Sequence, residues 1–246
     1  MILPLKSRSN FINEFLTPLG RVNSRCILRI DSEQVFSLIS TGDNTIVVYG
    51  KHTVDTDIEE SVTLNIPDLP RLLKIMQCID EDDVELDVQS NHIKYESDNI
   101  RFKYHLLEDG ILTLPPLSIE KINNLEFDTT FKAPFSSFIN LIKGSTFALD
   151  ISKVYFYTKD GAVFAELADK QAHNTDSMSI KLCDGFSGNS IDEPLPVGFE
   201  AIRTIVGVGT RCDSIVGKIN SKLNVLSFEV NNDNTKMTYI ISGLIK

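Results

Sequence analysis

The chain alternates between segments in which apolar residues recur at helical spacing and shorter segments in which apolar and polar residues alternate. Spacing of i, i+3, i+4 and i+7 is typical of a helix with one buried face, and alternation is typical of a half-buried strand. Four helices are predicted, over residues 9–17, 69–79, 134–144 and 200–206. The second is the best marked, because Asp68 can cap it, Pro70 suits its first turn, and Leu72 and Met76 share its apolar face.

Strands are predicted over most of the remaining chain, bounded by turn residues such as Thr41 to Asn44 and Asn231 to Asn234. They cover residues 25–30, 34–39, 45–49, 61–66, 84–88, 92–96, 100–105, 125–130, 153–157, 162–168, 177–182, 214–219, 224–230 and 236–244. Each half of the chain therefore has the order helix, strands, helix, strands, which indicates an internal structural repeat.

Residues 106–122 interrupt this pattern, since they contain Gly110, Pro115, Pro116 and isolated leucines. We interpret them as a linker. The sequence then predicts an α+β fold with two similar domains, residues 1–105 and 123–246.

The length of 246 residues and the 42% of hydrophobic residues suit one large or two small soluble domains. No apolar run approaches the roughly 20 residues that span a bilayer, and no export signal is present, so we expect no membrane association and a cytoplasmic location. The cysteines Cys26, Cys78, Cys183 and Cys212 lie far apart, and we interpret them as buried or half-buried thiols.

The sequence carries no recognisable catalytic or cofactor motif. The histidines are scattered, so no metal site and no other cofactor is expected. The chain lacks a P-loop, and Gly207 and Gly209 follow a predicted helix instead of opening one, which argues against a dinucleotide. We therefore expect a protein that is not an enzyme.

The net charge of −10 argues against binding nucleic acid, unless the basic residues are gathered in one place. They are concentrated in and beside the helices. Residues 5–21, 66–79, 132–147 and 199–212 hold nine basic and three acidic residues, a balance of +6 that leaves −16 for the rest of the chain. An acidic molecule with basic helices could repel phosphate on most of its surface and attract it at the helices.

The order of elements, the linker position and the sizes resemble the processivity clamps of DNA replication, closest to the sliding clamps of tailed bacteriophages. The resemblance is clearest in the first domain, where a short helix is followed by the strand segment from Val22 to Leu28. The helix from Asp68 to Met76, the acidic turn and the hairpin from Val84 to Glu96 come next. The resemblance to these clamps extends more weakly over the second domain.

Such clamps are rings of six similar domains, with β-sheets outside and two helices of each domain inside. The resemblance therefore implies a homotrimer that encircles duplex DNA regardless of its sequence. It also implies that the ring is opened by a clamp loader and tethers the replicative DNA polymerase in an infected bacterial cell. On the predicted second helix, Arg71 and Lys74 lie opposite the leucine face. The residues expected to face DNA are Arg71, Lys74, Lys143, Arg8, Arg21, Lys132, Lys6, Arg203 and Arg211.

Two further sites follow from the resemblance alone. Edge strands at residues 100–105 and 177–183 would join neighbouring subunits, through Ile100, Phe102, Tyr104, Met178, Ile180 and Leu182. A groove for hydrophobic peptide tails of partners would be formed by Ile39, Leu112, Leu114, Pro115, Leu117, Leu244 and Ile245. The alternatives are that both strands lie inside their own sheets and that the linker leucines only cover the join between two sheets.

Two other classes of function stay open at this point. A phage structural module rich in β-strands would share the acidic charge, but it would not need four helices in a two-fold repeat or a basic excess on them. An enzyme with an unrecognised site would need a pocket that holds strongly perturbed titratable groups.

Overall fold

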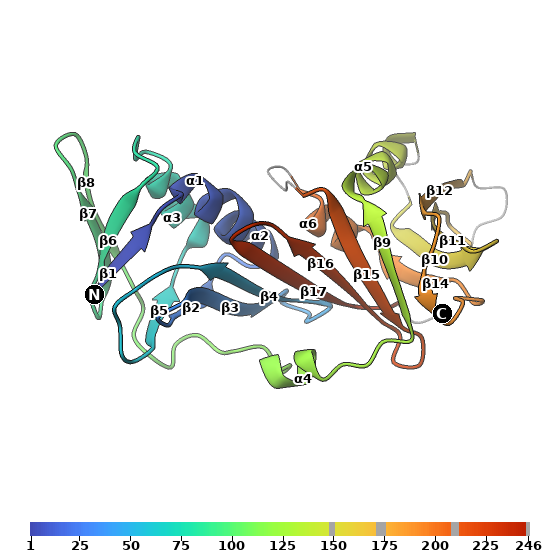
Figure 1. Cartoon of the computed structure of the whole chain (residues 1–246), viewed down its shortest axis with the longest axis horizontal. Helices are drawn as coiled ribbons and strands as arrows, with labels where there is room; N and C mark the ends of the chain where they lie inside the picture. Colours follow the sequence, from blue (N-terminus) through green and yellow to red (C-terminus); the bar gives the residue numbers. More distant parts are fainter. Residues whose placement is uncertain (148–150, 171–175, 208–211, 245–246) are drawn as a thin grey trace. The chain divides into compact units, whose positions relative to one another are not determined.

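The computed structural model describes residues 1–147, 151–170, 176–207 and 212–244. The chain divides into two compact units (Figure 1). The first comprises residues 1–119 with 232–237, and the second comprises residues 120–231 with 238–246. The first change of unit, between residues 119 and 120, lies within residues 106–122, and residues 232–237 return to the first unit. Strands dominate both units and the helices are short, so the α+β fold class is confirmed.

The first unit holds two antiparallel sheets and two helical regions. Its elements are β1 (Ile2–Leu5), α1 (Arg8–Asn10), η1 (Phe11–Leu16), α2 (Thr17–Val22), β2 (Cys26–Ile30), β3 (Gln34–Ser40), β4 (Ile46–Thr53), β5 (Val62–Ile66), α3 (Leu69–Met76), β6 (Val84–Val88), β7 (His92–Glu96) and β8 (Arg101–His105). One sheet has the strand order β1-β6-β7-β8, and the other includes β4-β3-β2-β5. Strand β1, which the sequence did not predict, pairs with β6.

The first helical region is longer than predicted, because it continues from α1 through η1 into α2. The middle part η1 is a π-helix, in which the Thr17 N–H donates to the Ile12 carbonyl five residues earlier. This wider turn comes directly before Pro18, whose ring and missing N–H disfavour a regular α-helical turn. Phe15 and Leu16 are fully buried here, so tertiary packing holds a segment that helix propensity alone would end earlier.

Helix α3 begins where the sequence predicts. The Asp68 carboxylate accepts a hydrogen bond of 2.9 Å from the Arg71 N–H, which satisfies one of the free donors of the first turn. Leu69, Leu72 and Met76 are buried, and they pack beside η1 and α2 (Figure 1). The helix ends at Met76, so it is shorter than the predicted range.

The second unit repeats this composition of two sheets and two main helices. Its elements are α4 (Ile119–Asn123), β9 (Thr129–Pro134), α5 (Phe135–Gly144), η2 (Ser145–Phe147), β10 (Lys153–Lys159), β11 (Ala162–Leu167), β12 (Met178–Cys183), β13 (Ser187–Gly188), β14 (Leu195–Gly198), α6 (Phe199–Ile205), β15 (Ser214–Asn220), β16 (Val225–Asn231) and β17 (Thr235–Ser242). One sheet has the order β12-β11-β10-β14, and the other includes β13-β9-β15-β16-β17.

Two predictions for this unit were wrong. The strand placed at residues 125–130 lies at Thr129–Pro134, where buried Phe131 and Ala133 face the core. The segment 183–193, in which no strand was predicted, contains the short strand β13 that pairs with β9. The two-residue strand β13 is defined by its pairing with β9, whereas β9 itself alternates between buried and more exposed residues.

A cluster of three phenylalanines joins helix α5 to both sheets of the second unit. Phe138 of α5 lies edge-on to Phe228 of β16, with ring centroids 5.7 Å apart. The ring of Phe156 of β10 lies 5.7 Å from Phe228 on another side. All three side chains are fully buried, so helix α5 is held firmly over one face of the sheet that contains β16.

Gly217 of β15 lies directly under the ring of Phe131, its cross-strand neighbour on β9. A Cβ atom at residue 217 would lie 2.2 Å from Phe131 Cζ, and the ring is buried and cannot move aside.

We expect Gly217→Ala to lower the free energy of unfolding by about 1–3 kcal/mol, the usual cost of overpacking. Urea unfolding would measure this loss. The control is Gly198→Ala, since nothing lies within 4 Å of a Cβ there and its φ is −63°. Equal stability of the two variants would contradict the prediction.

Candidate functional site

The exposed face of α3 carries two basic residues, as its periodicity predicts. Arg71 and Lys74 are exposed, and the buried side of the helix is made of Leu69, Leu72 and Met76. Helix α5 of the second unit has the same character, because Lys143 shares an exposed face with Ser136 and Asn140. Arg71, Lys74 and Lys143 therefore point away from the cores of their units, where a phosphate group could reach them.

Arg8 does not belong to this exposed set. Its guanidinium donates hydrogen bonds from Nε to the Glu81 carbonyl, at 2.8 Å, and from a terminal nitrogen to the Met76 carbonyl, at 2.9 Å. The bond to Met76 satisfies a carbonyl group at the C-terminal end of α3, where such groups lack partners within the helix, and the bond to Glu81 holds the turn that follows. The Arg8 guanidinium is therefore engaged inside the first unit, and its contact with DNA stays a prediction.

Lys132, predicted to lie beside the third helix, is on the strand β9 that precedes α5. On β9 the buried residues Phe131 and Ala133 face the core beneath α5, and successive side chains point to opposite faces. Lys132 is therefore exposed on the sheet face opposite to α5. A ligand that contacts the helices of this unit would not meet it.

The other basic residues that were predicted to face DNA differ from one another in exposure and in their contacts. Lys6 is exposed between β1 and α1, and Arg21 is half-buried in α2. Arg203 of α6 is exposed but engaged, because it forms an ion pair of 3.2 Å with Glu200 and its guanidinium lies 4.8 Å from the centre of the Phe199 ring. Arg211 lies outside the described residues.

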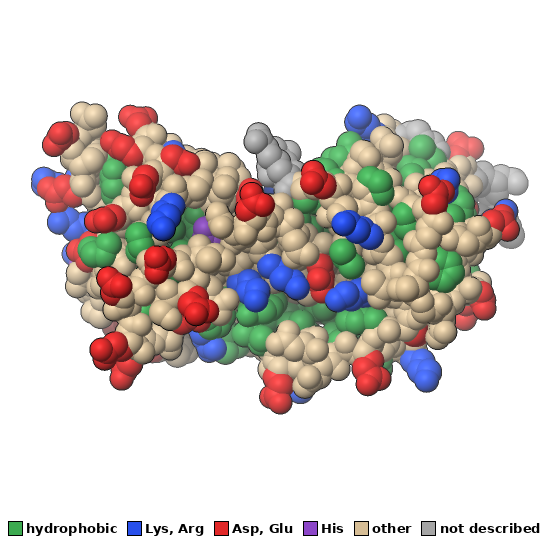
Figure 2. All heavy atoms as spheres, in the orientation of Figure 1, with side chains coloured by type: hydrophobic (Ala, Val, Ile, Leu, Met, Phe, Trp, Pro, Cys, Tyr) green, Lys and Arg blue, Asp and Glu red, His purple; other side chains and the backbone are tan. Residues whose placement is uncertain are grey.

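Acidic side chains are spread over the visible faces of both units (Figure 2). The chain has 34 acidic and 24 basic residues, so exposed basic groups on a helix contrast with the rest of the surface.

Within the described ranges, no three His, Cys, Asp or Glu side chains gather as metal ligands do. None of the helices described is long and apolar enough to cross a membrane. All four cysteines are free thiols, and Cys78 is exposed, contrary to the prediction.

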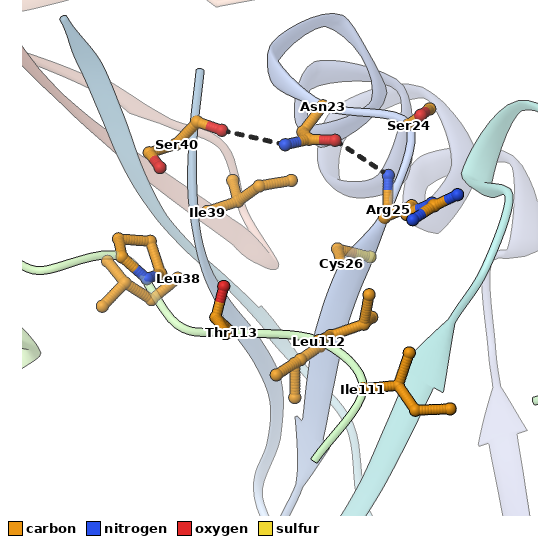
Figure 3. A pocket seen from close by; sticks show the side chains of 12 residues that line it. Asn23, Ser24, Arg25, Cys26, Leu38, Ile39, Ser40, Ile111, Leu112 and Thr113 are labelled. Atoms are coloured by element: carbon orange, nitrogen blue, oxygen red, sulfur yellow. Dashed lines mark hydrogen bonds between the residues drawn. The ribbon is translucent and has the colours of Figure 1, made fainter. Parts of the chain in front are cut away.

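A pocket of about 500 Å³ lies in the first unit, between the strand pair β2 and β3 and the segment 111–115 that crosses them (Figure 3). Ile39 of β3 is buried at its side, and Leu112 is half-buried on the crossing segment. Ile111 is 55% exposed, which is unusual for a residue of its size. The lining consists of Asn23, Ser24, Arg25, Cys26, Ile27, Leu38, Ile39, Ser40, Ile111, Leu112, Thr113 and Pro115.

Asn23 holds one end of this pocket together (Figure 3). Its side-chain amide donates to the Ser40 carbonyl at 3.2 Å, and its side-chain oxygen accepts from the Arg25 N–H at 3.1 Å. These two bonds connect the end of β3 to the start of β2. Burial raises the pKa of the Cys26 thiol to about 12, so this thiol is uncharged at neutral pH.

Three of the seven predicted groove residues line this pocket, namely Ile39, Leu112 and Pro115. Leu114 and Leu117 lie on the same segment but outside the lining. Leu244 belongs to the second unit, where its N–H donates to the Pro196 carbonyl, and Ile245 lies outside the described residues. Sequence reasoning missed the polar residues Asn23, Ser24, Arg25 and Ser40, because it searched only for apolar anchors.

The two strands predicted to join subunits are both edge strands among the described strands. β8 ends the sheet β1-β6-β7-β8, and β12 ends the sheet β12-β11-β10-β14, so neither is internal to its sheet. Each leaves a row of backbone donors and acceptors open on one side. Whether they pair with a second copy stays a prediction.

The predicted interface side chains divide into open and buried ones. Phe102, Met178 and Ile180 are half-buried on these strands, and Ile100 is half-buried just before β8. Tyr104 and Leu182 are only 4% and 1% exposed, so they are core residues of their own units, which corrects the prediction of a side-chain contact there. The Tyr104 hydroxyl donates to the Asp68 carbonyl at 2.7 Å and accepts from the Asp68 N–H at 3.0 Å, and burial raises its pKa to about 12.

Comparison with protein-family models gives no match, and neither does comparison with curated proteins. Solved structures do match over the full chain. A complex of PCNA2 and PCNA3 from Sulfolobus tokodaii matches with a TM-score of 0.78 and 13% identity, covering 99% of both chains. PCNA (Proliferating Cellular Nuclear Antigen) from Entamoeba histolytica matches with a TM-score of 0.78 and 14% identity, over 99% of this chain and 98% of that one.

The structure of A. fulgidus PCNA bound to the C-terminal region of FEN-1 matches with a TM-score of 0.80 and 15% identity. The match covers 100% of this chain and 98% of the other. The chain therefore has the clamp fold of these PCNA proteins, and the predicted clamp fold is confirmed. At this level of identity the likeness concerns the fold.

Proposed function

We propose that this protein is a DNA sliding clamp, a homotrimeric ring that encircles duplex DNA and tethers a replicative DNA polymerase. The observation that carries the proposal is the clamp fold over 99–100% of the chain, in two units of similar composition. A fold alone does not define a function, so the surfaces must fit as well. The tailed-phage source, and with it a bacterial host cell, is supported by the sequence resemblance alone.

The exposed basic residues support contact with DNA. Arg71 and Lys74 on α3, and Lys143 on α5, are cations on helices that are otherwise polar on their exposed faces. Cations of this kind contact phosphates without reading bases, which permits sliding along any sequence. The rest of the surface is acidic and would repel the phosphates of DNA.

The two edge strands support closure into a ring. A two-domain clamp subunit needs one donor edge and one acceptor edge, so that identical head-to-tail contacts can close. β8 lies in the first unit and β12 in the second, which provides one edge in each. Three copies of the 27.5 kDa chain would give a particle of about 82.5 kDa.

The pocket beneath residues 111–115 supports partner binding. It offers the half-buried side chain of Leu112 and the exposed side chain of Ile111 to an extended peptide, with Ile39 buried at its side. One of the matched structures contains PCNA bound to a C-terminal region of FEN-1. We infer that this pocket binds hydrophobic tails of the polymerase and of the clamp loader, since a few apolar anchors suffice.

Sedimentation over a wide concentration range, followed by loading on circular DNA, tests the ring. Growth of the mass to about 82.5 kDa and no further, with retention on nicked circles and release after the circle is cut, is the expected result. A monomer at every concentration, or growth without limit, would overturn the ring. Either outcome would favour the structural-module alternative.

The peptide pocket has its own test. Leu112→Ala should weaken the binding of a labelled peptide with leucine and phenylalanine anchors by about tenfold, because a central apolar contact is lost. Fluorescence anisotropy measures this change. Leu117→Ala is the matched control, since Leu117 is half-buried on the same segment but does not line the pocket. Equal affinities of the two variants would place the peptide elsewhere.

A further inference from the structure

The lining of the pocket beneath residues 111–115 has one charged side chain, Arg25. The other eleven of its twelve lining residues are apolar or uncharged polar residues, and none is Asp or Glu. This composition contrasts with the whole chain, in which acidic residues outnumber basic ones by 34 to 24. Local charge at this pocket is therefore positive on an acidic protein.

Arg25 lies at one end of the pocket, next to Asn23 and Ser24 (Figure 3). Its backbone is fixed, because its N–H donates to the Asn23 side chain, which in turn binds the Ser40 carbonyl. Its side chain is exposed, and with the described residues it forms no ion pair. The guanidinium is thus anchored at its base and open to an incoming ligand.

We propose that Arg25 binds a carboxylate of the partner segment, so that the pocket selects apolar tails that carry an acidic group. This inference rests on the proposed function of the pocket as a peptide site and adds the chemical class of the peptide. The guanidinium presents a planar pair of N–H donors that match a carboxylate, and its charge persists at any physiological pH.

Apolar anchors and the carboxylate have separate roles in this arrangement. The contacts with Ile111 and Leu112 supply most of the affinity, as apolar anchors do in other interfaces. Arg25 supplies selectivity and orientation, because an acidic segment is repelled by most of this surface and attracted at one end of the pocket. Because Arg25 is exposed, water and salt screen its ion pair with the carboxylate of the peptide. This ion pair therefore raises the affinity for the peptide only about fivefold.

The probes are three labelled peptides that share the anchors Leu-Ser-Ala-Phe-Leu. The first has Asp on both sides of the anchors and an amidated end, and the second has Asn at the same two places. The third has Asn at both places and a free terminal carboxylate directly after the anchors. The expected result on the natural protein is binding about fivefold tighter for the first or the third peptide than for the second. Which of the two binds tighter identifies the source of the carboxylate.

The same peptides are then measured on Arg25→Gln, Arg25→Lys and Arg29→Gln. Preference for the carboxylate should vanish in Arg25→Gln and persist in part in Arg25→Lys, which keeps the charge but loses the planar fork. Arg29 lies on β2 at the same parity as Arg25 but outside the pocket lining, so Arg29→Gln should keep the full preference. Raised salt should reduce the preference on the natural protein.

The outcomes separate this inference from the function on which it rests. Equal binding of all three peptides to the natural protein overturns the role of Arg25 and leaves the apolar pocket intact. A preference that survives in Arg25→Gln also overturns it. Binding of none of the peptides removes the pocket as a peptide site, and the proposal for Arg25 falls with it.

Discussion

Replacing both Arg71 and Lys74 by Glu should shorten the residence of the protein on nicked circular DNA by about tenfold and reduce clamp-dependent synthesis accordingly. Both side chains are exposed on the face of α3 opposite to Leu69, Leu72 and Met76, so their removal leaves the core intact. In a ring of three copies, the change would replace attraction by repulsion at every subunit. The mass in sedimentation should not change.

Salt dependence distinguishes this effect from a general loss of activity. Fewer phosphate contacts release fewer counterions, so the affinity of the variant should fall less steeply with salt than that of the natural protein. The control is Lys159→Glu with Lys222→Glu, the same change of charge at two exposed positions, the end of β10 and the turn between β15 and β16. Equal residence times for both double variants would remove Arg71 and Lys74 from the DNA-binding face.

Acidification from about pH 6.5 to pH 4 should lower the free energy of unfolding by about 3 kcal/mol through His52 alone. Burial lowers the pKa of His52 from 6.5 to about 4. The side chain is 5% exposed, its Nδ1 lies 2.7 Å from Thr235 Oγ1, and its ring packs at 5.1 Å against Phe11. Between these two pKa values the His52 side chain takes up a proton in the unfolded chain but not in the folded protein. The free energy of unfolding therefore has its full value above pH 6.5 and declines toward pH 4.

Urea unfolding at several pH values checks this prediction. His52→Gln cannot titrate, so its stability should lack this decline, whereas His105→Gln, a change at an exposed histidine, should keep it. Asp43 and Asp82 contribute in a different range. Hydrogen bonds from the Thr41 side chain to Asp43, and from the Ser9 N–H to Asp82, hold the pKa of each below 3.8, so their stabilisation is lost at lower pH. Parallel pH profiles for the natural protein and His52→Gln would contradict the role of His52.

Periodicity in the sequence predicted those elements whose burial pattern is local. β6 and β7 have the predicted bounds, because apolar and polar residues alternate clearly along Val84–Val88 and His92–Glu96. Helix α3 begins at the predicted residue, because its cap and its apolar stripe are both encoded within a few positions. The same stripe placed Arg71 and Lys74 on the exposed face.

Elements that depend on a distant partner were missed or displaced. β1 has only four residues and is defined by its pairing with β6, more than 80 positions later. β9 was displaced along the chain, since the burial of Phe131 results from its packing on Gly217. The π-helical turn η1 required the surrounding core of the first unit.

By itself, the sequence determined the α+β fold class and the exposed basic face of α3, and the resemblance to clamps indicated three residues of the pocket lining, Ile39, Leu112 and Pro115. Only the tertiary structure decided that Arg8 closes the end of α3, that Lys132 lies away from α5 and that Arg25 is the one charge in the pocket. The reason is physical: helical and strand periods are local properties of the chain, with repeats of 3.6 and 2.0 residues. The partner of a charged side chain is set by contacts between residues far apart in sequence, which no local pattern encodes.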